Sequence, residues 1–433
     1  MTQQSISSHV FGCRLTSYSR REAANSFCAL TREGIHILHR IQSRRTLAVC
    51  LLALAVVIGY GTLRWRVHAN SDIRIREAEG WLRKRENARA RETLKTLLWF
   101  EPRQYQALLI TGISLNADRK FPEAIAVLER IPDTSEQFEE GGIALASSLI
   151  HDKQLDRGES VLRRHLQLFP RSLATCEELV RLNLRLFRQR EAISLLLEFW
   201  GRGWDDFGAL PLLLELEVKT ATPHESVVSL EESDRQHPHQ PAVVLALARA
   251  YSLMGKTEQA QARFEDALRL KPQDFLTCFL AAEFFFNRGD VQSAQRLLNS
   301  ELEELNDDRY WFLRCRISEN SNNVEEAYFF LQKALARRPN DETYVLMQAT
   351  LLRRLERIEE SQASALRAAQ LAEDRKQLFL LSHQFDRDHP SPGLCLKISD
   401  HLERLGYLEQ ASAWRRVSNL ITTVEPANPA PGL

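Results

Sequence analysis

Small residues recur every 34 positions along most of this chain. The series is Ala90, Ala124, Gly158, Ala192, Ser226, Ala260 and Ala294. Four prolines fall on the same grid, each twelve positions after a small residue: Pro102, Pro170, Pro238 and Pro272. A fixed period of this length is typical of stacked structural repeats. Because such an array grows by adding units, the 433 residues need not divide into several globular domains.

The clearest unit spans residues 241–274. Its first half carries Leu247, Ala248, Tyr251 and Gly255, and its second half carries Ala260, Phe264, Ala267 and Pro272. The small residues allow two helices to approach closely, and the aromatic residues can fill the layer between units. Gly255 suits the left-handed end of a first helix. Pro272 cannot continue a second helix. The unit is therefore predicted to form a helix–turn–helix pair.

This pattern resembles the tetratricopeptide repeat, and the resemblance extends over roughly residues 71–420. It implies an all-α fold, a right-handed α-solenoid of stacked helix–turn–helix units. We expect the regular solenoid over residues 71–375, followed by an atypical C-terminal repeat with capping helices over residues 376–421. The grid breaks after Arg375, where residues 376–391 predict an additional helix and a turn. The unit at 207–240 matches weakly, because Pro211 falls within its first helix.

An apolar segment precedes the repeats. Residues 46–63 carry no charge, and arginines flank them on both sides. Eighteen residues approach the length that spans a bilayer core of about 30 Å, so a transmembrane helix is predicted over 46–66. Tyr60 and Trp65 could lie at the headgroup level. A buried core helix and a cleaved signal peptide are the alternatives. The run is longer than a signal core, and Arg64 and Arg66 precede any cleavage site after Ala69. An uncleaved anchor is favoured.

The sequence also bears on the order of the two tails and on the side of the membrane that the repeats occupy. Residues 1–45 form an Arg-rich tail, and residues 422–433 form a Pro-rich tail; both are expected to be disordered. Lysine and arginine counts on the two sides of the span do not decide the orientation. A single N-terminal span followed by a long folded domain favours repeats on the extracytoplasmic side. The alternative is a cytoplasm-facing assembly or secretion accessory factor.

Composition and motifs argue against several classes of function. The chain has 57 basic and 57 acidic residues, which argues against nucleic-acid binding. It has no Gly-rich phosphate loop, no H-E-x-x-H and no G-x-S-x-G motif, so no enzyme activity and no cofactor are expected. An enzyme with an unrecognised site would need a deep polar pocket. His237 and His239 are interpreted as turn residues rather than metal ligands.

The cysteines also argue against a metal site or a redox function. Seven are present without a C-x-x-C pair, which excludes a zinc ribbon or a thioredoxin motif. Four lie at apolar helix positions and are predicted to be buried: Cys176, Cys278, Cys315 and Cys395.

The family resemblance also implies which residues line the concave face. These are the inward positions of the first helices: Arg181, Arg185, Arg249, Phe279, Glu283, Phe286, Asn287, Arg309, Phe312, Arg316, Arg353 and Arg354. Arginine and aromatic residues are enriched at binding hot spots. The face is therefore expected to bind an extended peptide or a helix of another protein, with an acidic or C-terminal segment as the first guess. Each arginine could equally belong to a solvated face.

The sequence predicts a non-catalytic scaffold that the N-terminal helix anchors to a membrane. A self-associating structural protein is a further alternative, in which the weak unit at 207–240 makes a hinge or a self-contact. Related modules that clamp a terminal carboxylate carry an asparagine at position nine of a unit, and no unit here has one there, so that mode of binding is not implied.

Overall fold

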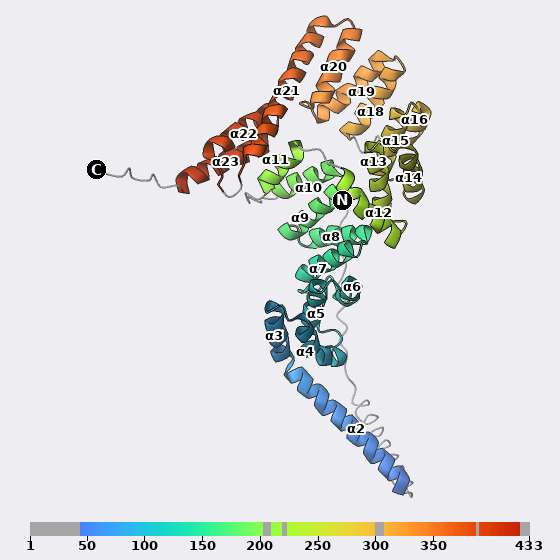
Figure 1. Cartoon of the computed structure of the whole chain (residues 1–433), viewed down its shortest axis with the longest axis vertical. Coiled ribbons are helices and arrows are strands. Elements are labelled where there is room, and N and C mark those ends of the chain that lie inside the picture. Colours follow the sequence, from blue (N-terminus) through green and yellow to red (C-terminus); the bar gives the residue numbers. More distant parts are fainter. Residues whose placement is uncertain (1–43, 202–208, 219–222, 299–306, 387–388, 425–433) are drawn as a thin grey trace, which may run out of the picture.

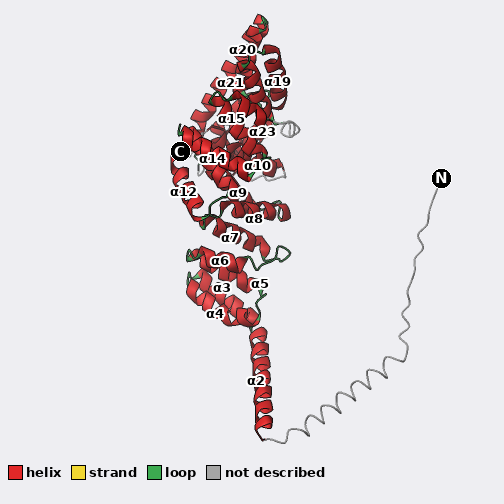
Figure 2. Cartoon of the chain, turned by 90° about the vertical axis from the view of Figure 1, so that its right-hand side faces the viewer, coloured by secondary structure: helices red, strands yellow, loops and turns green. Residues whose placement is uncertain are grey.

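The computed structural model describes residues 44–201, 209–218, 223–298, 307–386 and 389–424. Within these ranges the chain is helical and contains no strand. Figures 1 and 2 show a long apolar helix, α2 (Arg44–Ala69), that projects from one end of a curved stack of shorter helices. The tails predicted to be disordered lie mostly outside the described residues, although helix already covers 44–45 and 422–424.

The remaining helices follow one another as first and second members of repeats. In chain order they are α3 (Ser71–Arg83) and α4 (Asn87–Phe100), α5 (Tyr105–Ala117) and α6 (Phe121–Leu128), α7 (Phe138–His151) and α8 (Leu155–Leu168), α9 (Leu173–Arg185) and α10 (Gln189–Gly201), α11 (Ala209–Val218) and α12 (Pro223–Gln236), α13 (Pro241–Leu253) and α14 (Thr257–Leu270), α15 (Phe275–Asn287) and α16 (Val291–Leu297), α18 (Asp308–Asn320) and α19 (Val324–Arg337), α20 (Glu342–Arg354) and α21 (Ile358–Gln384), α22 (Pro392–Arg404) and α23 (Leu408–Val424). The predicted α-solenoid is confirmed.

The 34-residue series of small residues lies inside the stack. Its alanines and Gly158 are buried, and Ser226 is half-buried. A Cβ atom added at Gly158 would lie 2.8 Å from Ile150 Cγ1 of the preceding helix. Tyr251 and Phe264 are buried in the layer between units, and the four cysteines predicted to be buried are so. Close helix approach therefore explains the period.

The described turns within the repeats each have one residue in the left-handed region. Gly255 takes this place with φ of 72°. In other units the same place holds a residue with a side chain, including Arg119 with φ of 57° and Lys153 with φ of 66°. A side chain in this region costs roughly 1–2 kcal/mol, so several turns of the solenoid carry backbone strain.

One part of the chain departs from the regular stack. The first turn of α8 contacts the start of α13, because Asp156 accepts hydrogen bonds from the Ala242 backbone N–H at 3.1 and 3.2 Å. The Lys153 carbonyl accepts from Ser233 at 2.6 Å and from Gln240 at 2.8 Å. α8 therefore packs on α13, the turn before α8 contacts α12, and the helices between them in the chain, α9 to α11, lie to one side. α11 packs against α10, α21 and α23.

The expected helix break after Arg375 is wrong. α21 runs without interruption from Ile358 to Gln384, so the predicted boundary at 375 falls inside it. No glycine or proline interrupts this stretch. Leu371, Leu378 and Leu381 continue one buried face through it, which stabilises a single long helix.

α2 is the one helix of the described chain that is long and apolar enough to cross a membrane. The qualifying stretch, Ala48–Ala69, is 22 residues long and makes almost no buried contact along its length. Near its end, Val67 is only 2% exposed because it enters the core of the first repeat with Ile75 and Leu94. The apolar helix is thus joined firmly to the repeats.

Replacing Arg119 with glycine should stabilise the protein by about 1 kcal/mol, since glycine removes the left-handed strain at little cost in a turn. The Arg119 side chain is exposed. Urea unfolding of the full chain measures the effect, with Arg119→Ala as the control that should leave stability nearly unchanged. Equal stability of the glycine and alanine variants would contradict the strain argument.

Candidate binding groove

α10 lies against the inner side of the C-terminal half of the solenoid. Figure 1 shows α10 and α11 in the space that α13 to α23 curve around. Polar contacts hold α10 there: Arg190 pairs with Asp308 at 2.9 Å, and Glu191 pairs with Arg309 at 2.9 Å. Both partners stand in the first turn of α18. The chain therefore fills part of its own concave face.

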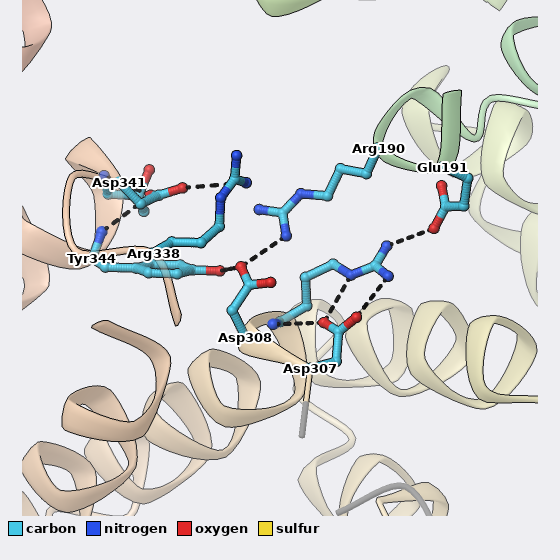
Figure 3. Close-up of polar contacts among 9 residues, drawn as sticks. Arg190, Glu191, Asp307, Asp308, Arg338, Asp341 and Tyr344 are labelled. Carbon is cyan, nitrogen blue, oxygen red and sulfur yellow. Dashed lines mark hydrogen bonds and ion pairs between the residues drawn. The ribbon is translucent and has the colours of Figure 1, made fainter. Parts of the chain in front are cut away.

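The first of these contacts belongs to a three-residue network (Figure 3). Asp308 Oδ2 accepts a hydrogen bond from the Tyr344 hydroxyl at 2.6 Å and faces the Arg190 guanidinium. Asp308 thus connects α10, α18 and α20. Burial alone would raise the pKa of Asp308, but Arg190 and Tyr344 outweigh it and hold the pKa below its ordinary value. Burial, together with the hydrogen bond to Asp308, raises the pKa of Tyr344. The network keeps a charged carboxylate in a half-buried place.

The second contact centres on Arg309. Its guanidinium pairs with the carboxylate of Asp307 at 2.9 Å and reaches Glu191 on its other edge. It also lies 5.5 Å from the ring centres of Phe275 and Phe279. Only 17% of the side chain is exposed. Burial disfavours the charge, yet the hydrogen bonds and charge of Asp307 raise the pKa of Arg309. This arginine is fully engaged within the chain.

A cavity of about 900 Å³ lies between α10 and the first helices α15, α18 and α20. Seven arginines and six carboxylates line it, so its charge is nearly balanced. The second oxygen of the Glu191 carboxylate is buried beside this cavity and has no hydrogen-bond partner among the described residues. The arginines and carboxylates of the lining present both donors and acceptors to a bound segment.

Several predicted binding residues meet at this cavity: Arg249, Phe279, Glu283, Arg309, Phe312 and Arg316. Arg249 donates a hydrogen bond to the carbonyl of Phe187, in the turn before α10. Burial lowers its pKa. The Phe312 ring lies 4.5 Å from that of Tyr344. Arg249 and Arg309 are therefore already engaged within the chain.

Four predicted residues form an open ladder beside the cavity: Phe286, Asn287, Arg316 and Arg354. Arg316 lies 4.7 Å from the ring centre of Phe286 and donates to Asn287 Oδ1 at 2.9 Å. On the next unit, Arg354 pairs with Glu319 at 2.9 Å. Asn287 is exposed. This ladder is the part of the predicted surface that α10 leaves accessible.

The other predicted residues lie elsewhere. Arg181 is exposed and pairs with Glu177 and Glu178 on its own helix. Arg185 donates to Ser229 of α12 at 3.0 Å, and burial lowers its pKa. Arg353 is exposed at the end of α20. The structure does not bring these three into the cavity.

The sequence analysis missed the residues that fix α10: Arg190, Glu191, Asp307, Asp308 and Tyr344. Their contacts join positions 118 apart, and no local pattern reports such a pairing. One signal was present. Asp307 directly precedes α18, as an N-cap residue does, and it caps the helix by accepting from the Arg309 N–H at 2.8 Å.

No metal-ligand group was found in the described parts of the chain, where no three histidine, cysteine or acidic side chains converge to hold an ion. His237 lies 3.5 Å from Asp152.

Comparison with known proteins identifies the repeat type. A tetratricopeptide-repeat family model matches residues 223–276 and 253–317. No curated protein sequence matches the chain. Among solved structures, the Cut9–Hcn1 hetero-tetramer of the APC/C is similar at 11% identity and a TM-score of 0.37, covering 89% of each chain. A MamA fragment from Desulfovibrio magneticus RS-1 shows 16% identity and a TM-score of 0.32, covering 38% of this chain and 94% of its own.

A third structure, YrrB, is described as a TPR protein with an unusual peptide-binding site. It shows 14% identity and a TM-score of 0.30, and the match covers 44% of this chain and 98% of that one. Similarity at this level does not bear on the partners of the present chain.

Replacing Asp308 with alanine should loosen α10, because it leaves the half-buried Arg190 without its carboxylate and Tyr344 without its acceptor. The loss of about 2 kcal/mol should speed hydrogen exchange of α10 amides roughly thirtyfold. Asp266→Ala, which breaks an outer-surface pair on α14, is the matched control and should leave α10 protected. Unchanged exchange in α10 would show that the network does not hold this helix.

Proposed function

We propose that this tetratricopeptide-repeat chain is a non-catalytic scaffold, anchored in a membrane by α2, that binds a segment of a partner protein in the groove beside α10. The observation that carries the proposal is the cavity of about 900 Å³ between α10 and the first helices α15, α18 and α20. Its size lies in the range of peptide and ligand sites. A tetratricopeptide solenoid offers such a groove to an extended or helical segment.

The surroundings of the cavity indicate the chemistry of the partner. Arginines and carboxylates nearly balance, and most of them already pair within the chain. The Arg316–Asn287 ladder offers a cation and an amide. Phe286 and Phe312 are half-buried apolar surfaces nearby. We infer a segment of mixed charge with an apolar or aromatic anchor.

The membrane part of the proposal rests on α2. α2 is exposed along its apolar window, and Arg64, Trp65 and Arg66 follow its uncharged stretch, which is the composition of a bilayer span. Its firm junction with the first repeat supports an anchor that holds the solenoid at the surface.

We place the repeats on the extracytoplasmic side, the usual layout of an exported domain behind one N-terminal span. Proximity labelling from the repeat domain in intact cells, with compartment-specific acceptor proteins, should label extracytoplasmic proteins. Labelling of cytoplasmic proteins would instead favour an assembly or secretion accessory factor that acts on the inner face.

The groove itself is tested by photo-crosslinking in cells. With p-benzoylphenylalanine at Asn287, the full chain should form a covalent adduct with a defined partner. The same group at Arg269, on the outer helix α14 with 77% of its side chain exposed, is the control and should not. Arg316→Ala in the Asn287 variant should weaken partner binding about tenfold, because a groove arginine on an aromatic ring acts as a hot spot. Identical adducts from both positions, or an adduct indifferent to Arg316, would contradict binding in this groove.

A further inference from the structure

We propose that the turn between α4 and α5 is a second membrane contact, in which Trp99 enters the bilayer interface and Arg64 and Arg103 bind the phosphates of anionic phospholipids. This inference rests on the membrane anchor of the proposed function. It adds a surface of the repeat domain itself to the apolar helix that alone carried the anchor.

The depth of this turn follows from its ring contacts. The Tyr60 ring on α2 lies 6.2 Å from the Trp99 ring and 5.5 Å from the Phe100 ring at the end of α4. Tyr60 precedes Arg64 by four residues, or about 6 Å along a helix axis. If α2 spans a bilayer up to Leu63, Trp99 lies beside the last apolar turn of the span.

The exposure of Trp99 shows that the core of the repeat does not need it. Its side chain is 68% exposed, whereas the adjacent Phe100 is 7% exposed and belongs to the core of the first unit. The two rings contact edge to face at 4.4 Å. A large aromatic residue held out of the core, at the level where an apolar helix ends, is what the bilayer interface favours.

Two cations complete the surface. Arg64 and Arg103 line a pocket of about 630 Å³ together with Phe100, Gln104 and Gln137. Neither guanidinium forms an ion pair or a side-chain hydrogen bond with another described residue. The carboxylate in this pocket, Glu101, is occupied by His68 at 2.6 Å. The pocket therefore offers two free guanidinium groups at the level of lipid headgroups, and phosphate oxygens are the anions that guanidinium binds in a bidentate manner.

The junction of α2 with the repeats holds this surface in place. Val67 packs between Ile75 and Leu94, and it follows Arg64 by less than one turn. The end of α4 therefore cannot swing away from α2 without opening the core of the first repeat. We infer that the bilayer covers Trp99 in the same geometry as in the present structure.

Photo-crosslinking in nanodiscs tests the contact with the full chain. The protein is reconstituted in phosphatidylglycerol-containing nanodiscs with p-benzoylphenylalanine in place of Trp99, of Val56 within the span, or of Leu168, an exposed apolar residue on α8. Lipid adducts, read by mass spectrometry, are expected at positions 99 and 56 and not at 168. An adduct at 56 without one at 99 would overturn this inference and leave the anchor intact. No adduct at 56 would overturn the anchor and the inference together.

The role of the cations is tested in the position-99 protein. Removing both charges by Arg64→Gln and Arg103→Gln should lower the lipid adduct in anionic nanodiscs, because each basic residue near an anionic surface contributes roughly fivefold to binding. Arg119→Gln with Arg353→Gln removes two exposed charges elsewhere and should not. The adduct at position 56 in matched proteins corrects for insertion. An unchanged adduct after loss of both arginines would overturn phosphate binding.

Discussion

The contact between the first turn of α8 and the start of α13 determines the shape of the rest of the molecule. It joins residues 80 to 87 positions apart through the Lys153 carbonyl and the Asp156 carboxylate. Burial raises the pKa of Asp156, and the Ala242 N–H bonds oppose that rise. α13 thus receives its capping acceptor from α8, which fixes the stacking order. Since α8 and α13 are neighbours, α9 to α11 cannot occupy a place between them.

Two of these helices, α10 and α11, pack against the concave face of the solenoid. Arg190 and Glu191 meet Asp308 and Arg309, and α11 packs on α21 and α23. A buried charge is costly unless it is paired, and here each buried arginine of the inner face has an acceptor. The groove consequently has an internal occupant. A partner protein meets only the cavity and the ladder that α10 leaves open, which narrows the binding surface to a few first helices.

The sequence predicted the parts of this fold that depend on local spacing. Close packing at Ala90 or Ala260 acts within one repeat, so the 34-residue period reports it directly. The docking of α10 was not predictable. Its ion pairs join residues from different repeats, and the 34-residue period carries no information about which distant repeats come into contact. The weak unit at 207–240 contains α11, one of the helices that leave the stack, but α9 and α10 belong to the preceding unit and α12 stays in the stack. The pattern alone offered a hinge or a self-contact, and it could not show that the contact is made with the chain's own α18 to α23. The continuity of α21 was also not predicted. The expected boundary at residue 375 was placed where the 34-residue period ends, without regard to the helix propensity of the residues that follow.

The contacts of α10 and α11 divide the solenoid into an N-terminal part that bends more easily and a C-terminal part that is stiffer. From α3 to α7 each helix packs only on near neighbours in the chain, as a linear array does. From α12 to α23 the stack is also braced across its concave side by α10 and α11. A linear array bends by small changes at each interface, whereas the braced part must break ion pairs to open. Bending therefore concentrates in α3 to α7, which lie between α2 and the groove. The first repeat is itself fixed to α2 through Val67, so the flexible part is short. The groove keeps its shape while its position relative to α2 varies. This arrangement suits a site that binds a partner whose own position is fixed independently of α2.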